Sequence, residues 1–205
     1  MDNSVNNNGF DYVDLGLPSG TLWASCNVGA SKPSDFGFYF QWGDTDGYTD
    51  SQVGIGEGKK KFASDWRDYK WYSEGVFTKY ITLGATLELE DDAAHTNIGG
   101  DWHIPSREQI KELLDNTTRK WATLDGVSGM TFTSTKDTSK YIFIPAEDDA
   151  WNGSVEGIGY YGGIWSSMLS NGYVICGKYL YFYSDFAYLD FGSRYRGLSV
   201  RGVIG

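Results

Sequence analysis

Five consecutive residues near the end of the chain, from Tyr179 to Tyr183, alternate between tyrosine and an apolar residue. Successive side chains of a β-strand point to opposite faces of a sheet. We therefore expect Leu180 and Phe182 to face the core and the three tyrosines to face solvent. Tyrosine gives a large contact area and a hydroxyl at low entropic cost, which is typical of binding surfaces. The alternative is an ordinary solvent-facing strand with amphipathic side chains.

The segment after this strand, Asp185 to Ser193, mixes aromatic, small and acidic residues. It shows neither helical nor strand periodicity, so we expect an aromatic loop. Such a mixture is typical of a paratope, and the alternative is a surface loop that packs on itself. The candidate ligand-binding residues are Tyr173, Ile175, Tyr181, Tyr183, Asp185, Phe186, Tyr188, Asp190, Phe191, Ser193, Tyr195 and Arg196.

Length and charge restrict the class of protein. The chain has 205 residues, a formal net charge of −10 and 17% aromatic residues. The acidic balance argues against nucleic-acid and anionic membrane partners, which attract lysine and arginine patches. No apolar stretch approaches the length of a membrane span. We expect residues 1–9 to be a disordered lead-in and residues 10–205 to form one domain.

One helix is predicted by its local signals. Ser106 is a natural N-cap, and Gln109 three residues later completes a capping box for a helix that ends near Asn116. After this helix the pattern indicates only strands and turns, and the combination predicts an α+β domain with long loops. The predicted strands lie within Tyr12–Ala24, Thr131–Thr133, Tyr141–Pro145, Ile164–Met168, Tyr179–Ser184 and Tyr195–Ile204.

Motifs distributed over nearly the whole chain carry a family resemblance. They lie in Tyr12–Ala30, Phe40–Thr45, Asp91–His95, Gly99–Glu108, Gly162–Ser167 and Gly197–Arg201. Together they resemble the "major paralogous" surface domains common in Bacteroidetes, although that family usually has arginine in place of His103. The resemblance implies a C-type lectin fold, of α+β class.

The chain also resembles the variable proteins of diversity-generating retroelements, for which the same fold is expected. In such proteins the adenines of a template are randomised while the C-terminal segment is copied. Asparagine codons of the template then cannot become Lys, Glu, Gln, Met or Trp, and none of these five occurs from Tyr179 to Val203. The alternative is a composition bias of a tyrosine-rich strand.

The resemblance implies a variable region over about residues 160–203. Its varied positions are the candidate binding residues from Tyr181 onward. The implied fixed positions are Trp165, Ser166, Ser167, Leu180, Phe182, Ser184, Arg194, Gly197, Ser199, Val200 and Arg201.

Metal and catalytic signals are weak. The run from Glu147 to Gly153 holds three acidic residues and an asparagine, which suit Ca²⁺, but a capped acidic turn is the alternative. The Glu-Pro-Asn or Gln-Pro-Asp loop usual in sugar-binding C-type lectins does not occur, so we expect no cofactor. Of two cysteines, only Cys176 lies toward the C-terminal end, whereas formylglycine-generating enzymes need a pair there. We therefore expect no enzymatic activity.

The sequence thus predicts a ligand-binding protein with a diversified C-terminal surface. The expected partner is a macromolecule, either a cell-surface protein or a glycan, and the expected location is a cell surface, the extracellular space or a phage particle. Arg196 is a candidate ligand anchor, whereas Arg201 and Trp165 are expected to be structural. The alternatives are a structural or adhesive surface domain without variable recognition, and a carbohydrate-binding lectin.

Overall fold

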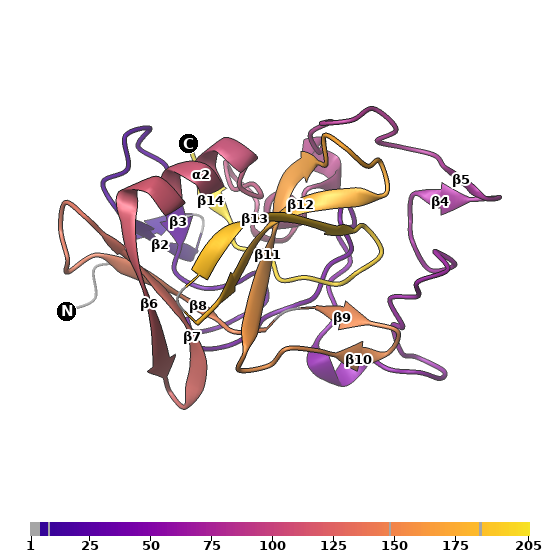
Figure 1. Cartoon of the computed structure of the whole chain (residues 1–205), viewed down its shortest axis with the longest axis horizontal. Helices are drawn as coiled ribbons and strands as arrows, with labels where there is room; N and C mark the ends of the chain where they lie inside the picture. The colour runs from indigo at the N-terminus through magenta and orange to yellow at the C-terminus, as the bar shows by residue number, and fades with distance from the viewer. Residues whose placement is uncertain (1–4, 8, 148, 185) are drawn as a thin grey trace.

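The computed structural model describes residues 5–7, 9–147, 149–184 and 186–205, and in residues 5–7 the backbone alone (Figure 1). The helices are α1 (Ala93–Ile98) and α2 (Arg107–Asn116), with short 3-10 turns η1 (Asp50–Gln52) and η2 (Leu89–Asp91). The strands are β1 (Val5–Asn7), β2 (Phe10–Asp14), β3 (Leu22–Ala24), β4 (Tyr72–Ser73), β5 (Val76–Phe77), β6 (Thr117–Leu124), β7 (Val127–Ser134), β8 (Tyr141–Pro145), β9 (Ala150–Trp151), β10 (Ser154–Val155), β11 (Tyr161–Leu169), β12 (Cys176–Tyr183), β13 (Phe186–Ser193) and β14 (Val203–Ile204).

The expectation of an α+β C-type lectin fold is wrong. Strands account for 38% of the residues and helices for 11%, and the strands form five small antiparallel sheets. The reason is local, because only two short segments of the described chain combine an N-cap with a helical run. Alternating aromatic and β-branched residues over most of the second half favour strands instead.

Strands from both ends of the chain share the sheet with the order β1-β2-β3-β14. Val203 of β14 lies opposite Trp23 of β3, so the C-terminal strand closes onto the N-terminal hairpin. The lead-in predicted for residues 1–9 contains a strand, because Val5–Asn7 pairs with Phe10–Asp14. Residues 1–4 and 8 lie outside the described part of the chain.

Helix α2 begins and ends where its signals predict. The Ser106 hydroxyl accepts from the Gln109 amide at 3.1 Å, and the Gln109 side chain accepts from the Ser106 amide at 2.8 Å. Ile110 and Leu113 point from the helix into the main core. This core also receives residues from the sheets β6-β7-β8 and β11-β12-β13, so it fixes the orientation of the C-terminal sheet beside α2 (Figure 1).

The C-terminal sheet has the order β11-β12-β13. Leu180 and Phe182 of β12 are completely buried in the core, as predicted. The aromatic loop predicted for Asp185 to Ser193 is wrong, because Phe186–Ser193 forms β13 and pairs with β12 along its whole length. Asp185 lies outside the described residues.

The buried guanidinium groups of Arg194 and Arg201 tie the C-terminal segment to the rest of the molecule. Arg201 donates to the carbonyl oxygens of Ala24 and Phe143 and to the Asn27 side chain, at 2.8–3.0 Å. Its predicted structural role is confirmed, as is the core position of Trp165. Burial lowers the pKa of Arg201 to about 10. The guanidinium therefore stays charged at neutral pH, and its charge strengthens these hydrogen bonds.

Candidate functional site

Five aromatic side chains gather on one face of the C-terminal sheet, and we call them the tyrosine face. They are Tyr161 of β11, Tyr181 and Tyr183 of β12, and Phe186 and Tyr188 of β13. The register explains the grouping, because Tyr161 lies opposite Tyr183, Tyr181 opposite Tyr188, and Tyr183 opposite Phe186. Residues directly opposite each other in antiparallel strands point to the same face. Three strands therefore bring together residues from two hairpins.

The rings of the tyrosine face contact one another continuously. Tyr161 and Tyr181 stack with an interplanar angle of 16° and a centroid distance of 6.0 Å. Tyr183 stacks on Phe186 at 5.4 Å, and Tyr188 meets Tyr181 edge to face at 5.6 Å. Offset-stacked and edge-to-face pairs at these distances are favourable. The side chains therefore support one another before any partner binds.

Exposure increases across the sheet from β12 to its two outer strands. Tyr161, Phe186 and Tyr188 are between 42% and 59% exposed, whereas Tyr181 and Tyr183 on the central strand are half-buried. Three of the five rings thus offer large areas to a partner. The rings of Tyr181 and Tyr183 on the central strand are less accessible to a partner.

Tyr179 differs from the expectation that all three tyrosines of β12 face solvent. It is only 9% exposed and packs against the buried Trp165 at 5.8 Å. It also meets Tyr181 edge to face at 6.0 Å. Tyr179 therefore connects the tyrosine face with a second hydrophobic core, which includes Trp42, Trp165 and Leu169. It does not contribute to the exposed surface.

Acidic and phenolic groups set the electrostatics beside the tyrosine face. The pKa of Tyr188 is raised by partial burial and by the nearby charge of Asp190, so its phenol remains protonated at neutral pH. Asp190 accepts a hydrogen bond from the Phe191 amide at 2.9 Å. The face therefore offers hydroxyl groups and aromatic rings next to a negative charge, which suits apolar and basic groups of a partner.

The other predicted binding residues do not join the tyrosine face. Tyr173 packs against Phe191 at 5.4 Å, and both residues are exposed, as is Ile175. Phe191 lies three residues after Tyr188 in β13. Residues that are an odd number apart in a strand point to opposite sides of the sheet, so Phe191 does not belong to the tyrosine face. Ser193 lies opposite Cys176 at the end of β13.

Tyr195 and Arg196 are not among the five rings of the tyrosine face, and each is engaged by other residues of the chain. Tyr195 is 9% exposed and meets Trp66 edge to face at 4.7 Å. The Arg196 guanidinium donates to Asp149 at 2.5 Å and lies over the Trp151 ring. Both side chains are thus engaged within the molecule. Neither is positioned as a free ligand anchor.

Tyr161 belongs to the site but was missed by periodicity. It begins β11 and lies opposite Tyr183 in the register. The sequence signal was the pair of glycines that follows it, at Gly162 and Gly163. A Cβ atom on Gly162 would lie 2.0 Å from the Phe182 ring, so this position requires glycine. Such a requirement indicates a strand that crosses closely over an aromatic neighbour, with Tyr161 on the other side.

The acidic run that suggested Ca²⁺ does not converge on one point. Glu147 is buried and accepts from the Ser199 hydroxyl at 2.8 Å, whereas Asp149 pairs with Arg196. Asn152 accepts from the Ser64 amide at 3.2 Å. Asp148 lies outside the described residues. The groups that are described thus have separate protein partners.

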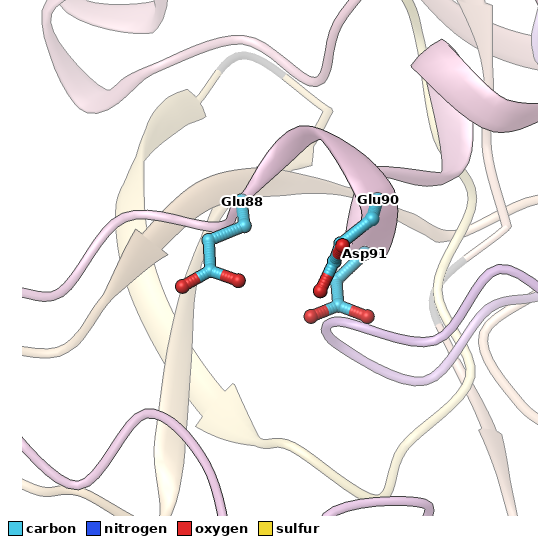
Figure 2. A group of neighbouring side chains, drawn as sticks. All are labelled: Glu88, Glu90 and Asp91. Atoms are coloured by element: carbon cyan, nitrogen blue, oxygen red, sulfur yellow. The ribbon is translucent and has the colours of Figure 1, made fainter.

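A different acidic cluster lies at η2, where Figure 2 shows Glu88, Glu90 and Asp91. It is the one group of three or more metal-binding side chains close to one another among the described residues. The Lys79 ammonium lies 2.5, 3.2 and 2.6 Å from these three carboxylates in turn, and Lys70 contacts Asp91 at 3.1 Å. A lysine charge therefore already occupies the centre of the cluster, which explains it without a metal ion.

A cavity of about 550 Å³ lies between β2, the segment 25–33 and β8. Its lining includes Phe10, Cys26, Lys32 and Tyr141. Cys26 and Cys176 are both buried and free, and Lys32 is already paired with Asp125 at 3.3 Å. The cavity contains none of the predicted binding residues. The strands β2 and β8 that border the cavity belong to two other sheets than that of the tyrosine face.

No protein-family model matches the chain, and no curated protein or solved structure is significantly similar to it. The resemblances to surface domains and retroelement variable proteins therefore stay predictions. No helix in the described ranges is long and apolar enough to cross a membrane. We therefore infer the function from the geometry of the tyrosine face.

Proposed function

We propose that this protein binds a macromolecular partner, a cell-surface protein or a glycan, through the tyrosine face. The observation that carries the proposal is a continuous set of five rings on three paired strands, with three of the rings 42–59% exposed. Exposed apolar patches of this kind mark interaction sites in soluble proteins. Tyrosine-rich surfaces are typical of proteins that recognise others.

Rigidity of the underlying sheet favours this function. Leu180 and Phe182 are completely buried directly beneath the tyrosine face, and the rings above them contact one another. A side chain that is already ordered loses little conformational entropy when a partner binds. The surface is thus prepared for binding at low cost, as in a matured paratope.

We also propose that this surface is diversified, as in retroelement variable proteins. The burial of the implied positions supports the proposal. The implied fixed positions are buried except for Ser184, which lies at the turn between β12 and β13. The described varied positions are exposed or half-buried except for Tyr195. Substitution would therefore change the surface while the core stays intact.

Flanking DNA tests diversification independently of binding. We expect a reverse-transcriptase gene and a second copy of the 3′ end, differing from the first at adenines of the template. The differing codons are expected to fall on the varied positions and to spare Leu180 and Phe182. If the flanking DNA holds neither feature, the surface is not diversified and the non-variable alternative is favoured.

The binding proposal is tested by a triple variant, Tyr181→Ala, Tyr183→Ala and Phe186→Ala. The matched control replaces Ile55, Ile81 and Tyr141, which are exposed on other parts of the molecule. Each protein is applied to arrays of bacterial surface proteins and of bacterial glycans. We expect the triple variant to lose binding, the control to retain it, and all three proteins to melt at similar temperatures. A triple variant that binds normally, or that unfolds, contradicts the proposal.

A further inference from the structure

The outer edge of β13 borders the tyrosine face, because Phe186 and Tyr188 of that face belong to β13. The sheet has the order β11-β12-β13, so β13 pairs with β12 on one side only. Among the described residues, no strand and no isolated bridge pairs with its other side. The edge is eight residues long and its register with β12 contains no bulge.

The hydrogen-bond pattern shows which main-chain groups point outward. The Arg194 amide donates to the Ile175 carbonyl at 3.0 Å, which makes Cys176 and Ser193 a non-hydrogen-bonded pair. Pairs of the two kinds alternate along antiparallel strands. The N–H and C=O groups of Ala187 and Leu189 therefore point away from β12, toward the open edge.

These outward groups are not occupied by other parts of the described chain. The main-chain hydrogen bonds of turns and loops include none donated by the amides of Ala187 and Leu189, whereas the Phe191 amide donates to the Asp190 side chain. Natural proteins usually protect such edges with lysine, proline or a bulge. The sequence of β13 contains no lysine or proline, and Asp190 is its one charged residue.

Exposed aromatic residues flank the edge on both sides of the sheet. Phe186 and Tyr188 belong to the tyrosine face, and Phe191 points to the opposite side. A strand added beside β13 would receive main-chain hydrogen bonds from Ala187 and Leu189, and its alternate side chains would contact these rings. Main-chain bonds with pockets for alternate side chains are how extended peptides bind sheet edges.

We infer that the partner of the tyrosine face is a protein, and that an extended segment of it pairs with the edge of β13. This inference rests on the proposed function and narrows it. The charge of the chain, −10, and Asp190 at the edge favour a segment that combines apolar with basic side chains. The same net charge on two copies opposes pairing of β13 with a second copy of the chain.

The test uses a library of random twelve-residue peptides displayed on phage and selected against the intact protein. The best peptide is synthesised, and amide hydrogen exchange of the protein is followed by NMR with and without it. We expect exchange at Ala187 and Leu189 to be fast in the free protein and to slow by at least about tenfold when the peptide binds. The Tyr188 amide, which points toward β12, is the internal control. Unchanged exchange at Ala187 and Leu189 in the complex overturns the inference.

A pair of variants tests the edge without altering the tyrosine face. Ala187→Pro removes an outward N–H but keeps the bonds between β12 and β13, because proline is tolerated where an edge amide faces solvent. Ala187→Val retains the N–H and is the matched control. We expect Ala187→Pro to weaken peptide binding by at least about tenfold and Ala187→Val to leave it nearly unchanged. Melting curves of both variants confirm that the fold is kept.

The outcomes separate this inference from the proposed function. If the peptide no longer binds the triple tyrosine-face variant but still binds Ala187→Pro, pairing with the edge of β13 is overturned. The proposed function of the tyrosine face is then retained. Selection of no peptide, together with glycan binding on an array, also overturns the inference alone. Self-association that protects Ala187 and Leu189 without a peptide replaces the inferred partner with a second copy.

Discussion

A buried carboxyl group gives the sharpest prediction about stability. The Glu147 side chain is 2% exposed, and one of its oxygens, Oε2, has no hydrogen-bond partner. Burial raises its pKa to about 8, although the hydrogen bond from Ser199 and the nearby Tyr39 hydroxyl act in the opposite direction. The folded protein therefore holds this proton at neutral pH, whereas the unfolded chain releases it near the ordinary value of 4.5.

The sign and size of the pH effect follow from this difference. Between pH 4.5 and pH 8 the folded state binds more protons at Glu147 than the unfolded state, so stability falls as pH rises. The two pKa values, about 8 and 4.5, differ by roughly 3.5. At about 1.4 kcal/mol for each unit, this is a loss of up to about 5 kcal/mol by pH 9. Below pH 4.5 the penalty is absent.

Glu147→Gln isolates this contribution, because glutamine resembles the protonated acid and does not titrate. We expect the variant to match the wild type at pH 4.5 and to exceed it by several kcal/mol at pH 9. Urea denaturation across this pH range measures the free energy of unfolding, with Glu57→Gln on an exposed loop as the control. If the wild-type and Glu147→Gln profiles run parallel, the carboxyl group is not held protonated in the folded state.

Three further substitutions test the packing that positions the site. Gly162→Ala places a methyl group 2.0 Å from the Phe182 ring, so we expect a loss of about 2 kcal/mol, and an unchanged melting temperature would contradict that close contact. Ser106→Ala removes the N-cap of α2 and should cost about 1 kcal/mol in urea denaturation, whereas no change would show that the cap is dispensable. Arg194→Met removes buried donors to the segment 69–80 and should cost about 3 kcal/mol, with faster proteolysis within that segment; proteolysis at the wild-type rate would contradict this role.

Local signals in the sequence were sufficient for the elements whose stability is local. The helix after Ser106 was predicted because its capping box and apolar stripe lie within a few residues. The inward direction of Leu180 and Phe182 was predicted because β12 is covered on one face by the core. In both cases one side of the element is buried, so apolar residues recur at the period of the helix or strand and predict it.

The strand β13 was missed because it carries exposed aromatic residues on both of its faces, although Ala187 and Leu189 also pack against the main core. Tyr188 is exposed on one face and Phe191 on the other, so no alternation between apolar and polar residues marks it. The burial of Tyr195 has another cause, since it depends on Trp66. Contacts between residues so far apart in the sequence leave no local pattern.

The fold class was wrong for a related reason. Motif resemblance concerns particular residues, such as Trp165 and Arg201, and both are indeed buried in the core. The share of helix is decided instead by the segments between the motifs. In the described chain from 43 to 88 those segments form turns, a short 3-10 turn and two-residue strands rather than helices.

Binding through the tyrosine face is the central claim, and photo-crosslinking tests it most directly. A benzophenone amino acid replaces Phe186 in one protein and Tyr141, which is similarly exposed on β8, in a second. Each is irradiated on bacterial cells, and adducts are counted by mass spectrometry. We predict abundant adducts with one partner from position 186 and background from position 141. Equal adducts from both positions, or none from position 186, would contradict the claim.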